Sequence, residues 1–219
     1  QCPVEAVRLK DGAVQGAAGS IQLAEISRTW YLKPQELDTE ADPAGLEVTA
    51  GYKPERDSGT FSYATHAAVI AVDPLTGEIE LLDYVIAEDG GVLVNPMIVD
   101  GQILGGLAQG IGTALFEEMV YSTDGQPQAS TLSEYLLPGP TEVPDAQIIH
   151  LETPSPYTRF GVKGIGEGGC IAPPAAITNA INDALRAIGV ELSVLPVTPR
   201  RIVEAVAAAS DSSLGKVTT

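Results

Sequence analysis

The segment IVDGQILGGLAQGIGTALFEEM occupies residues 98–119. Apolar residues recur along it at helical spacing, which predicts a single helix over residues 98–119. Five glycines nevertheless lie inside this helix, and each interior glycine costs about 0.5–1 kcal/mol relative to alanine. We therefore expect the glycines to allow close approach of a neighbouring element or of a cofactor.

Two glutamines, Gln102 and Gln109, lie on nearly the same face of this predicted helix because they are seven residues apart. An amide side chain can both donate and accept hydrogen bonds. The pair could therefore bind a polar ligand. The alternative interpretation is that both amides lie at the surface or between helices.

A second glycine-rich stretch, GVKGIGEGG, occupies residues 161–169 and precedes a predicted helix. Glycines leave backbone N–H groups accessible, and a helix N-terminus adds partial positive charge, so an anionic ligand is plausible here. Lys163 could assist such a ligand. Glu167 has no evident packing role among the glycines and, if shielded from water, could accept a proton. The alternative is a purely structural turn.

Other short patterns exclude several kinds of site. Residues 164–169 do not directly follow a predicted strand, so the dinucleotide-binding pattern of G-x-G-x-x-G directly after a strand is not met, and no G-K-[ST] sequence is present. Both observations disfavour a small nucleotide-binding module. His66 and His150 have no metal-ligand pattern around them, so no metal ligand is assigned. Cys170 has neither a His nor a second Cys nearby in sequence, which argues against a nucleophilic role.

The remaining elements predict an α+β fold with mixed sheets, β-hairpins and packed glycine-rich helices. The segments that read as strands are residues 7–9 with 13–14, 61–72, 78–86, 132–137, 148–151 and 191–195. Further helices are expected over residues 20–26 (capped by Ser20), 171–188 and 200–209. Residues 33–46 read as an acidic loop. We divide the chain into an N-terminal segment (1–57), a main domain (58–209) and a flexible tail (210–219).

Composition and charge exclude other functions. The chain has 219 residues and a net charge of −17, which argues against binding to nucleic acid or to an anionic membrane surface. No apolar run approaches the ~20 residues of a membrane-spanning helix. Two cysteines are a sparse disulfide set for a secreted protein. A cytoplasmic protein is therefore expected.

The two glycine-rich stretches, with their flanking residues, resemble the C-terminal part of the molybdenum-containing subunit of the xanthine dehydrogenase, aldehyde oxidase and CO dehydrogenase family. The matching segments are EDGG (88–91), NPMIVDGQ (95–102), GGLAQGIG (105–112), GVKGIGEGG (161–169), PAAI (174–177) and LPVTP (195–199). The resemblance covers residues 58–204 and is weaker over 1–57. An ordered series of this kind is far more specific than a single glycine motif.

The resemblance implies a role for each matching residue. Glu167 matches the family's active-site glutamate beside molybdenum, the general base of a hydroxylation that takes its oxygen from water. Gln102 matches a glutamine that hydrogen-bonds the pterin, and the glycine-rich turn lies against the same cofactor. The candidates for cofactor binding are Gln102, Gln109, Lys163, Gly164, Ile165 and Gly166.

The resemblance also implies partner chains. The family's molybdenum subunit is several times longer than this chain, so we expect the complementary N-terminal part on a partner that shares the cofactor. That cofactor is molybdopterin or its cytosine dinucleotide, with molybdenum. Fe–S clusters and FAD, which receive the electrons, are expected on other subunits, since two cysteines cannot supply the thiolates of a cluster. The start at Gln1 without an initiator Met favours proteolytic processing, or an omitted leader, over a separately initiated gene.

The expected substrate is an N-heteroaromatic compound or an aldehyde. A CO-oxidising enzyme is one alternative, since CO is also used within the family. The other alternative is a non-catalytic assembly or scaffold subunit that keeps the fold without the chemistry. The retention of Glu167 and Gln102 favours an enzyme over a scaffold.

Overall fold

The chain forms two compact units, residues 1–53 and residues 54–219. The computed structural model of the protein describes residues 3–37, 46–47, 49–53 and 60–214. The domain boundary expected between residues 57 and 58 lies outside the described residues and stays a prediction. Both glycine-rich stretches belong to the second unit.

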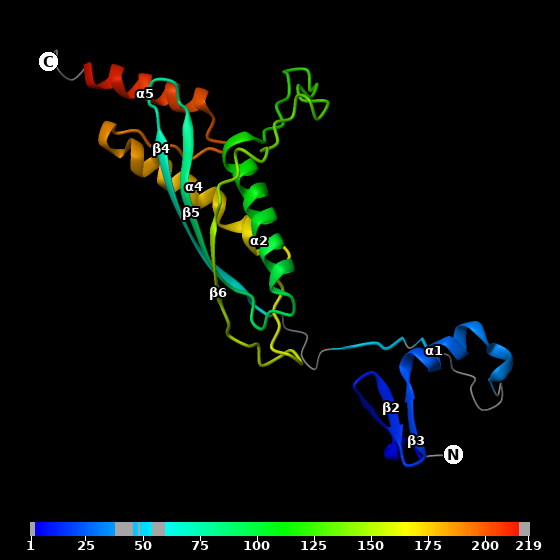
Figure 1. The fold of residues 1–219 in the computed structure, drawn as a ribbon. Helices are drawn as coiled ribbons and strands as arrows, with labels where there is room; N and C mark the ends of the chain where they lie inside the picture. Colours follow the sequence, from blue (N-terminus) through cyan, green and yellow to red (C-terminus); the bar gives the residue numbers. More distant parts are fainter. Residues whose placement is uncertain (1–2, 38–45, 48, 54–59, 215–219) are drawn as a thin grey trace. The chain divides into compact units, whose positions relative to one another are not determined.

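The first unit contains a small antiparallel sheet followed by a helix (Figure 1). Its elements in chain order are η1 (Val4–Ala6), β1 (Arg8–Lys10), β2 (Ala13–Gly16), β3 (Gly19–Gln22), α1 (Leu23–Leu32) and η2 (Pro34–Glu36). Asp11 and Gly12 have positive φ angles between β1 and β2, as a tight hairpin turn requires. The hairpin expected around these two residues is therefore confirmed.

The helix expected over residues 20–26 is wrong in its first part. Ser20 pairs with Gln15 between β2 and β3, and α1 begins only at Leu23. Strand pairing satisfies backbone groups of residues 19–22 that a helix N-terminus would leave without partners. In the expected acidic loop, residues 34–36 form η2, whereas residues 38–45 lie outside the described residues.

The second unit contains a three-stranded sheet in the order β4-β5-β6. Strands β4 (Tyr63–Val72) and β5 (Ile79–Asp89) pair as the expected antiparallel hairpin. Strand β6 (Gln147–Leu151) then joins parallel to β5, which confirms the strand expected there. Exposed and half-buried residues alternate along β4, so one face of the hairpin points inward and the other is open to solvent.

Helices cover the inward face of this sheet. They are α2 (Pro96–Ile111), a π-helical turn η3 (Gly112–Phe116), α3 (Gly168–Ile171), α4 (Pro173–Leu185), η4 (Arg186–Ile188) and α5 (Pro199–Leu214). Helix α4 lies against β4, and Figure 1 shows α5 near the β4–β5 turn. The core joins Tyr84 and Ile86 of β5 to Ile103 of α2 and Ile177 of α4. This is the expected α+β architecture, and none of the helices described is long and apolar enough to cross a bilayer.

The glycine-rich helix is shorter at its end than expected. It begins at Pro96, where Asn95 accepts a hydrogen bond from the Ile98 N–H, as an N-cap residue does. It ends at Phe116, because the N–H of Glu117 bonds back to the carbonyl of Gly112 and the chain then turns extended. Residues 117–119 are therefore outside the helix.

The strands expected over residues 132–137 and 191–195 are wrong. The carboxylate of Glu134 accepts hydrogen bonds from the N–H groups of Ser130 and Thr131 and curls the first segment into a turn. Leu192 exchanges two hydrogen bonds with the side-chain amide of Asn182, at 2.8 and 2.9 Å. This side chain takes the place of a neighbouring strand.

The helix expected over residues 171–188 is present in three pieces. Ala172 interrupts it between α3 and α4, where Pro173 and Pro174 cannot donate to the preceding turn. Gly189, with φ +72°, ends it as expected. The last helix, α5, continues past the expected end at Ala209 to Leu214. Of the expected flexible tail, residues 215–219 lie outside the described residues.

Candidate functional site

The two glycine-rich stretches meet through one hydrogen bond. The side-chain amide of Gln102, on α2, donates from Nε2 to the carbonyl oxygen of Gly166 at 3.1 Å, across 64 residues of sequence. Gln102, Gly166 and the neighbouring Glu167 are all exposed. The structure therefore brings the principal amide and the principal carboxylate expected from the sequence to one open surface.

Two of the glycines in α2 are required by close packing. A Cβ atom on Gly106 would lie 2.8 Å from the backbone of both Gly169 and Cys170, and one on Gly110 would lie 2.6 Å from the ring of Pro173. Reciprocally, a Cβ atom on Gly169 would overlap the carbonyl of Ile103. The close approach expected of the glycine-rich helix is therefore the contact of α2 with α3 and with the start of α4.

Other glycines of α2 have no such neighbour. A Cβ atom on Gly101 or on Gly105 would meet nothing within 4 Å among the residues described. Both glycines are exposed and lie one helical turn apart. Packing within this unit therefore does not account for glycine at these positions.

We expect Gly106→Ala and Gly105→Ala to have opposite effects on stability. The first should lower the free energy of unfolding by about 1–3 kcal/mol, because the new methyl group overpacks α2 against the backbone of residues 169–170. The second should raise it by about 0.5–1 kcal/mol through helix propensity alone. Urea denaturation of both variants checks this, and equal effects would show that the close contact of α2 with α3 is incorrect.

The glycine-rich turn has an inward and an outward side. Ile165 packs against the hydrophobic core, whereas Gly164, Gly166 and Glu167 are exposed. Within the described part of the chain, the N–H groups of residues 164–166 have no hydrogen-bond partner. A Cβ atom on Gly164 would meet nothing within 4 Å. Free donors on an open backbone next to an exposed amide fit a flat, polar, anionic group.

Lys163 points away from this outward side. Its side chain is 7% exposed and forms an ion pair with the fully buried Asp89, with 2.9 Å between Nζ and Oδ1. The ammonium group also lies 4.8 Å from the ring centre of Tyr63. The structure therefore separates Lys163 from Gln102 and Glu167 and ties the start of the turn to the end of β5.

Asp89 is held by several donors at once. The N–H of Gly91 donates to its Oδ1 atom and the hydroxyl of Tyr63 to its Oδ2 atom, each at 2.9 Å. Burial alone would raise the pKa of Asp89, but hydrogen bonds from Thr153, Lys163 and Gly91 outweigh burial and hold this pKa well below its ordinary value. The carboxylate is therefore ionised and anchors the turn.

The sequence alone did not identify Asp89 as functionally placed. It appeared only as one letter of the EDGG segment, and its partner Lys163 lies 74 residues away. Two features of the sequence could have indicated the ion pair. An acidic residue, Asp89, precedes a pair of glycines, and a lysine, Lys163, lies inside the glycine-rich turn. No periodicity links two such positions.

Of the other residues considered from sequence, Cys170 lies beside Glu167, because its Sγ atom donates to the carbonyl oxygen of Glu167 at 3.1 Å, and the others lie elsewhere. Gln109 is exposed on α2, one turn beyond the contact between Gly106 and α3. His66 bonds to the hydroxyl of Tyr84 and His150 to the carboxylate of Asp100. Among the residues described, no group of three or more His, Cys, Asp or Glu side chains could hold a metal ion.

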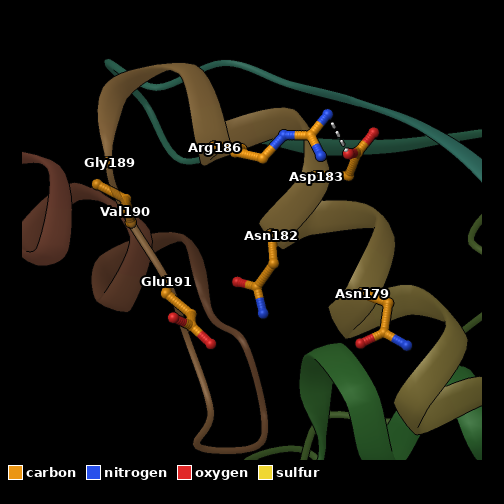
Figure 2. A pocket seen from close by; sticks show the side chains of 7 residues that line it. All are labelled: Asn179, Asn182, Asp183, Arg186, Gly189, Val190 and Glu191. Carbon is orange, nitrogen blue, oxygen red and sulfur yellow. Dashed lines mark ion pairs between the residues drawn. The ribbon is translucent and has the colours of Figure 1, made fainter.

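A polar cleft of about 410 Å³ lies elsewhere, at the C-terminal end of α4. Figure 2 shows Asn182 pointing toward the chain that follows Gly189, and Arg186 paired with Asp183. Both ends of the Asn182 amide are bonded to Leu192, and the pair of Arg186 and Asp183 is 80% and 69% exposed. The polar side chains of Asn182, Asp183 and Arg186 are thus bonded within the cleft itself, and we assign no ligand to it.

An exposed amide beside free backbone N–H groups, on a glycine-rich helix and a glycine-rich turn, is typical of proteins that bind a polar, anionic ligand. Comparison with known families agrees. Residues 1–144 match the model of the molybdopterin cofactor-binding domain, and the chain belongs to this family. The resemblance drawn from the sequence motifs is confirmed.

Relatives extend the match beyond residue 144. The chain is 40% identical over 204 residues to the nicotine 6-hydroxylase large subunit of Paenarthrobacter nicotinovorans, covering 92% of this chain and 25% of that protein. It is 38% identical over 190 residues to the 6-hydroxypseudooxynicotine dehydrogenase complex subunit gamma of the same organism, covering 86% and 23%. The chain therefore spans about a quarter of the length of these relatives.

A solved structure shows the same fold. Quinoline 2-oxidoreductase from Pseudomonas putida 86 superposes with a TM-score of 0.74 at 39% identity, covering 93% of this chain and 26% of that one. The relatives found by sequence are molybdenum-dependent oxidoreductases, including a CO dehydrogenase large chain from Hydrogenophaga pseudoflava at 33% identity. The chain thus corresponds to part of a molybdenum hydroxylase large subunit.

Proposed function

We propose that this chain forms one wall of the active site of a molybdenum hydroxylase, which hydroxylates an N-heteroaromatic compound or an aldehyde with water as the oxygen source. The observation that carries the proposal is the hydrogen bond from Gln102 to the carbonyl of Gly166. This bond joins α2 to the glycine-rich turn that bears Glu167. The two glycine-rich stretches, which the sequence resemblance assigns to one cofactor, thus form one surface.

The residues of this surface have distinct roles in the proposal. Gln102 uses one amide N–H on Gly166, which leaves its carbonyl oxygen and second N–H for the pterin. The N–H groups of Gly164, Ile165 and Gly166 donate to the same cofactor. Glu167 accepts the proton released when water supplies oxygen to the substrate. When bound, the molybdenum–pterin cofactor, as molybdopterin or its cytosine dinucleotide, supplies the two-electron oxidation.

Two further residues take supporting roles. Lys163 acts through Asp89, because its ammonium is buried in that ion pair, and it holds the turn that the cofactor contacts. Gln109 is exposed on α2 and contacts a more distant part of the cofactor than Gln102 does. Lys163 is therefore a positioning residue and Gln109 a secondary ligand.

The proposal requires partner chains. The exposed carboxylate of Glu167 has to be shielded from water to act as an efficient base, and this chain spans a quarter of the relatives' length. The complementary part of the molybdenum subunit completes the site, and subunits with Fe–S clusters and FAD take up the electrons. We place the assembled enzyme in the cytoplasm.

An N-heteroaromatic substrate is favoured over the alternatives. The relatives near 40% identity bear names that refer to nicotine and quinoline, whereas the CO dehydrogenase chains found by sequence are 33% and 30% identical. An aldehyde oxidoreductase from Megalodesulfovibrio gigas is 36% identical over a shorter span. A non-catalytic scaffold would have no use for the exposed amide of Gln102 and the exposed carboxylate of Glu167 beside an open, glycine-rich turn.

The role of Gln102 is testable through cofactor content. In the assembled enzyme, Gln102→Ala should lower bound molybdenum and pterin by about tenfold at limiting cofactor, which corresponds to the loss of one or two hydrogen bonds. The matched control is Gln126→Ala, an exposed glutamine in the loop after η3. Metal analysis and pterin fluorescence measure the result. Full molybdenum content in the Gln102 variant would show that this amide does not bind the cofactor.

A further inference from the structure

The carboxyl group of Glu88 is buried without a partner. Glu88 lies next to the last residue of β5, its side chain is 1% exposed, and neither of its oxygen atoms has a hydrogen-bond partner among the residues described. An ionised carboxylate in this position would cost several kcal/mol unless a cation or donors compensated it. Among the residues described, no donor bonds to this carboxyl group and the nearby cationic groups are paired elsewhere, so the buried group needs another explanation.

Glu88 lies directly beneath the turn that carries Glu167. A Cβ atom added to Gly168 would overlap Oε1 of Glu88, and Gly168 is the residue that follows Glu167. The same carboxyl group lines a cavity of about 160 Å³ between the start of β4 and α3. The side chain thus fills the space that supports the first residue of α3.

The charged groups around Glu88 are already paired. On the turn, Lys163 is bound to Asp89; on the adjacent strand β6, His150 is bound to Asp100 of α2. The other titratable groups nearby are Tyr63 of β4, which donates to Asp89, and the exposed Glu167. Burial raises the pKa of Glu88 above its ordinary value of 4.5, and His150 opposes this only in part.

We infer that Glu88 is a positioning residue for Glu167, and that it supports the turn as a neutral carboxylic acid. A neutral acid of this length fills the space beneath Gly168 without placing an unpaired charge in the core. Its ionisation would put a second negative charge next to the Glu167 turn and draw water into the cavity. This inference rests on the proposed role of Glu167 as the base.

Two variants of the assembled, molybdenum-loaded enzyme separate the parts of this inference. Glu88→Gln keeps the shape of the neutral acid and cannot ionise, so its kcat should stay within about twofold of wild type. Glu88→Ala removes the support, so kcat should fall by about tenfold or more through misplacement of Glu167, with KM within about twofold. Hydrogen exchange of the peptide covering residues 161–172 should be faster in the alanine variant and unchanged in the glutamine variant.

Stability against pH supplies a readout independent of activity. The pKa of Glu88 is raised in the fold, so its contribution is complete below pH 4.5 and is lost as the pH rises toward the folded-state pKa. The unfolding midpoint of Glu88→Gln should therefore rise relative to wild type as the pH increases above 4.5. This measurement remains decisive even if the alanine variant does not assemble.

Each contrary outcome overturns either one part of the inference about Glu88 or the proposed function on which it rests. Equal pH dependence of wild type and Glu88→Gln would show that Glu88 is ionised, and wild-type kcat and exchange in Glu88→Ala would show that it positions nothing. If Glu167→Gln retains full turnover, the proposed function itself fails. If Glu167→Gln is inactive while both Glu88 variants match wild type, only the present inference fails.

Discussion

Replacing Asp89 by asparagine is expected to lower the free energy of unfolding by about 3–5 kcal/mol. The change leaves the ammonium of Lys163, which is 7% exposed, without its anion in the interior. It also weakens the hydrogen bonds that Gly91 and Tyr63 donate to the carboxylate. Because the ion pair joins β5 to the glycine-rich turn, the variant should also lose cofactor along with stability.

The matched control is Asp183→Asn, which breaks an ion pair of similar length, 3.0 Å, on the surface of α4. Its partners are 69% and 80% exposed, so solvent screens the interaction and the expected loss is about 0–1 kcal/mol. Chemical denaturation of both variants at neutral pH measures the difference. A loss below about 1 kcal/mol for Asp89→Asn would contradict the buried ion pair.

The pH dependence of the free energy of unfolding provides a second test of the stabilising role of the Asp89 carboxylate. The pKa of Asp89 is lowered in the fold from its ordinary value of 3.8. The unfolded chain therefore binds the proton more readily, and the stabilisation is present above pH 3.8 and lost as the pH falls below it. Wild type should lose stability more steeply in acid than Asp89→Asn does.

The sequence predicted those parts of the fold that depend on local pattern. The hairpin of β4 and β5, the glycine-rich helix and the helix ended by Gly189 follow from alternation, helical spacing and turn residues. The expected strands over residues 132–137 and 191–195 were wrong because single side chains, Glu134 and Asn182, satisfy the backbone there. The apolar content of a segment cannot show that a side chain, and not a neighbouring strand, will bond its backbone groups.

The candidate site was predictable as a list of residues and not as an arrangement. Gln102 and Glu167 stood out by their residue types beside glycines, but their meeting depends on the packing of Gly106 against α3. Lys163 was expected among the ligands because it is cationic, whereas its side chain is directed to Asp89. Glu88 gave no signal, since the burial of its carboxyl group arises from the contact between β5 and α3.

Glu167 is expected to carry most of the chemistry that this chain contributes. In the assembled enzyme, Glu167→Gln keeps the size and the polar contacts of the side chain and removes its ability to accept a proton. General base catalysis contributes about a factor of 10² to 10⁴, so kcat should fall by that factor. Bound molybdenum should be unchanged, because Gln102 and the backbone of the turn are left intact.

The matched control is Glu191→Gln, an exposed carboxylate in the cleft at the other end of α4 (Figure 2). This variant changes the net charge by the same amount as Glu167→Gln. Glu191 lines the cleft at the C-terminal end of α4, to which no role in the reaction is assigned. Its kcat and molybdenum content should equal those of wild type. The comparison therefore removes any general effect of one lost charge.

The most direct test of Glu167 as the base is the rate of substrate hydroxylation by fully molybdenum-loaded Glu167→Gln. A fall in kcat of about 10² or more, at wild-type molybdenum content and with Glu191→Gln unaffected, is the predicted result. Turnover of the Glu167 variant within a few-fold of wild type would contradict it. The chain would then belong to the family without supplying the base.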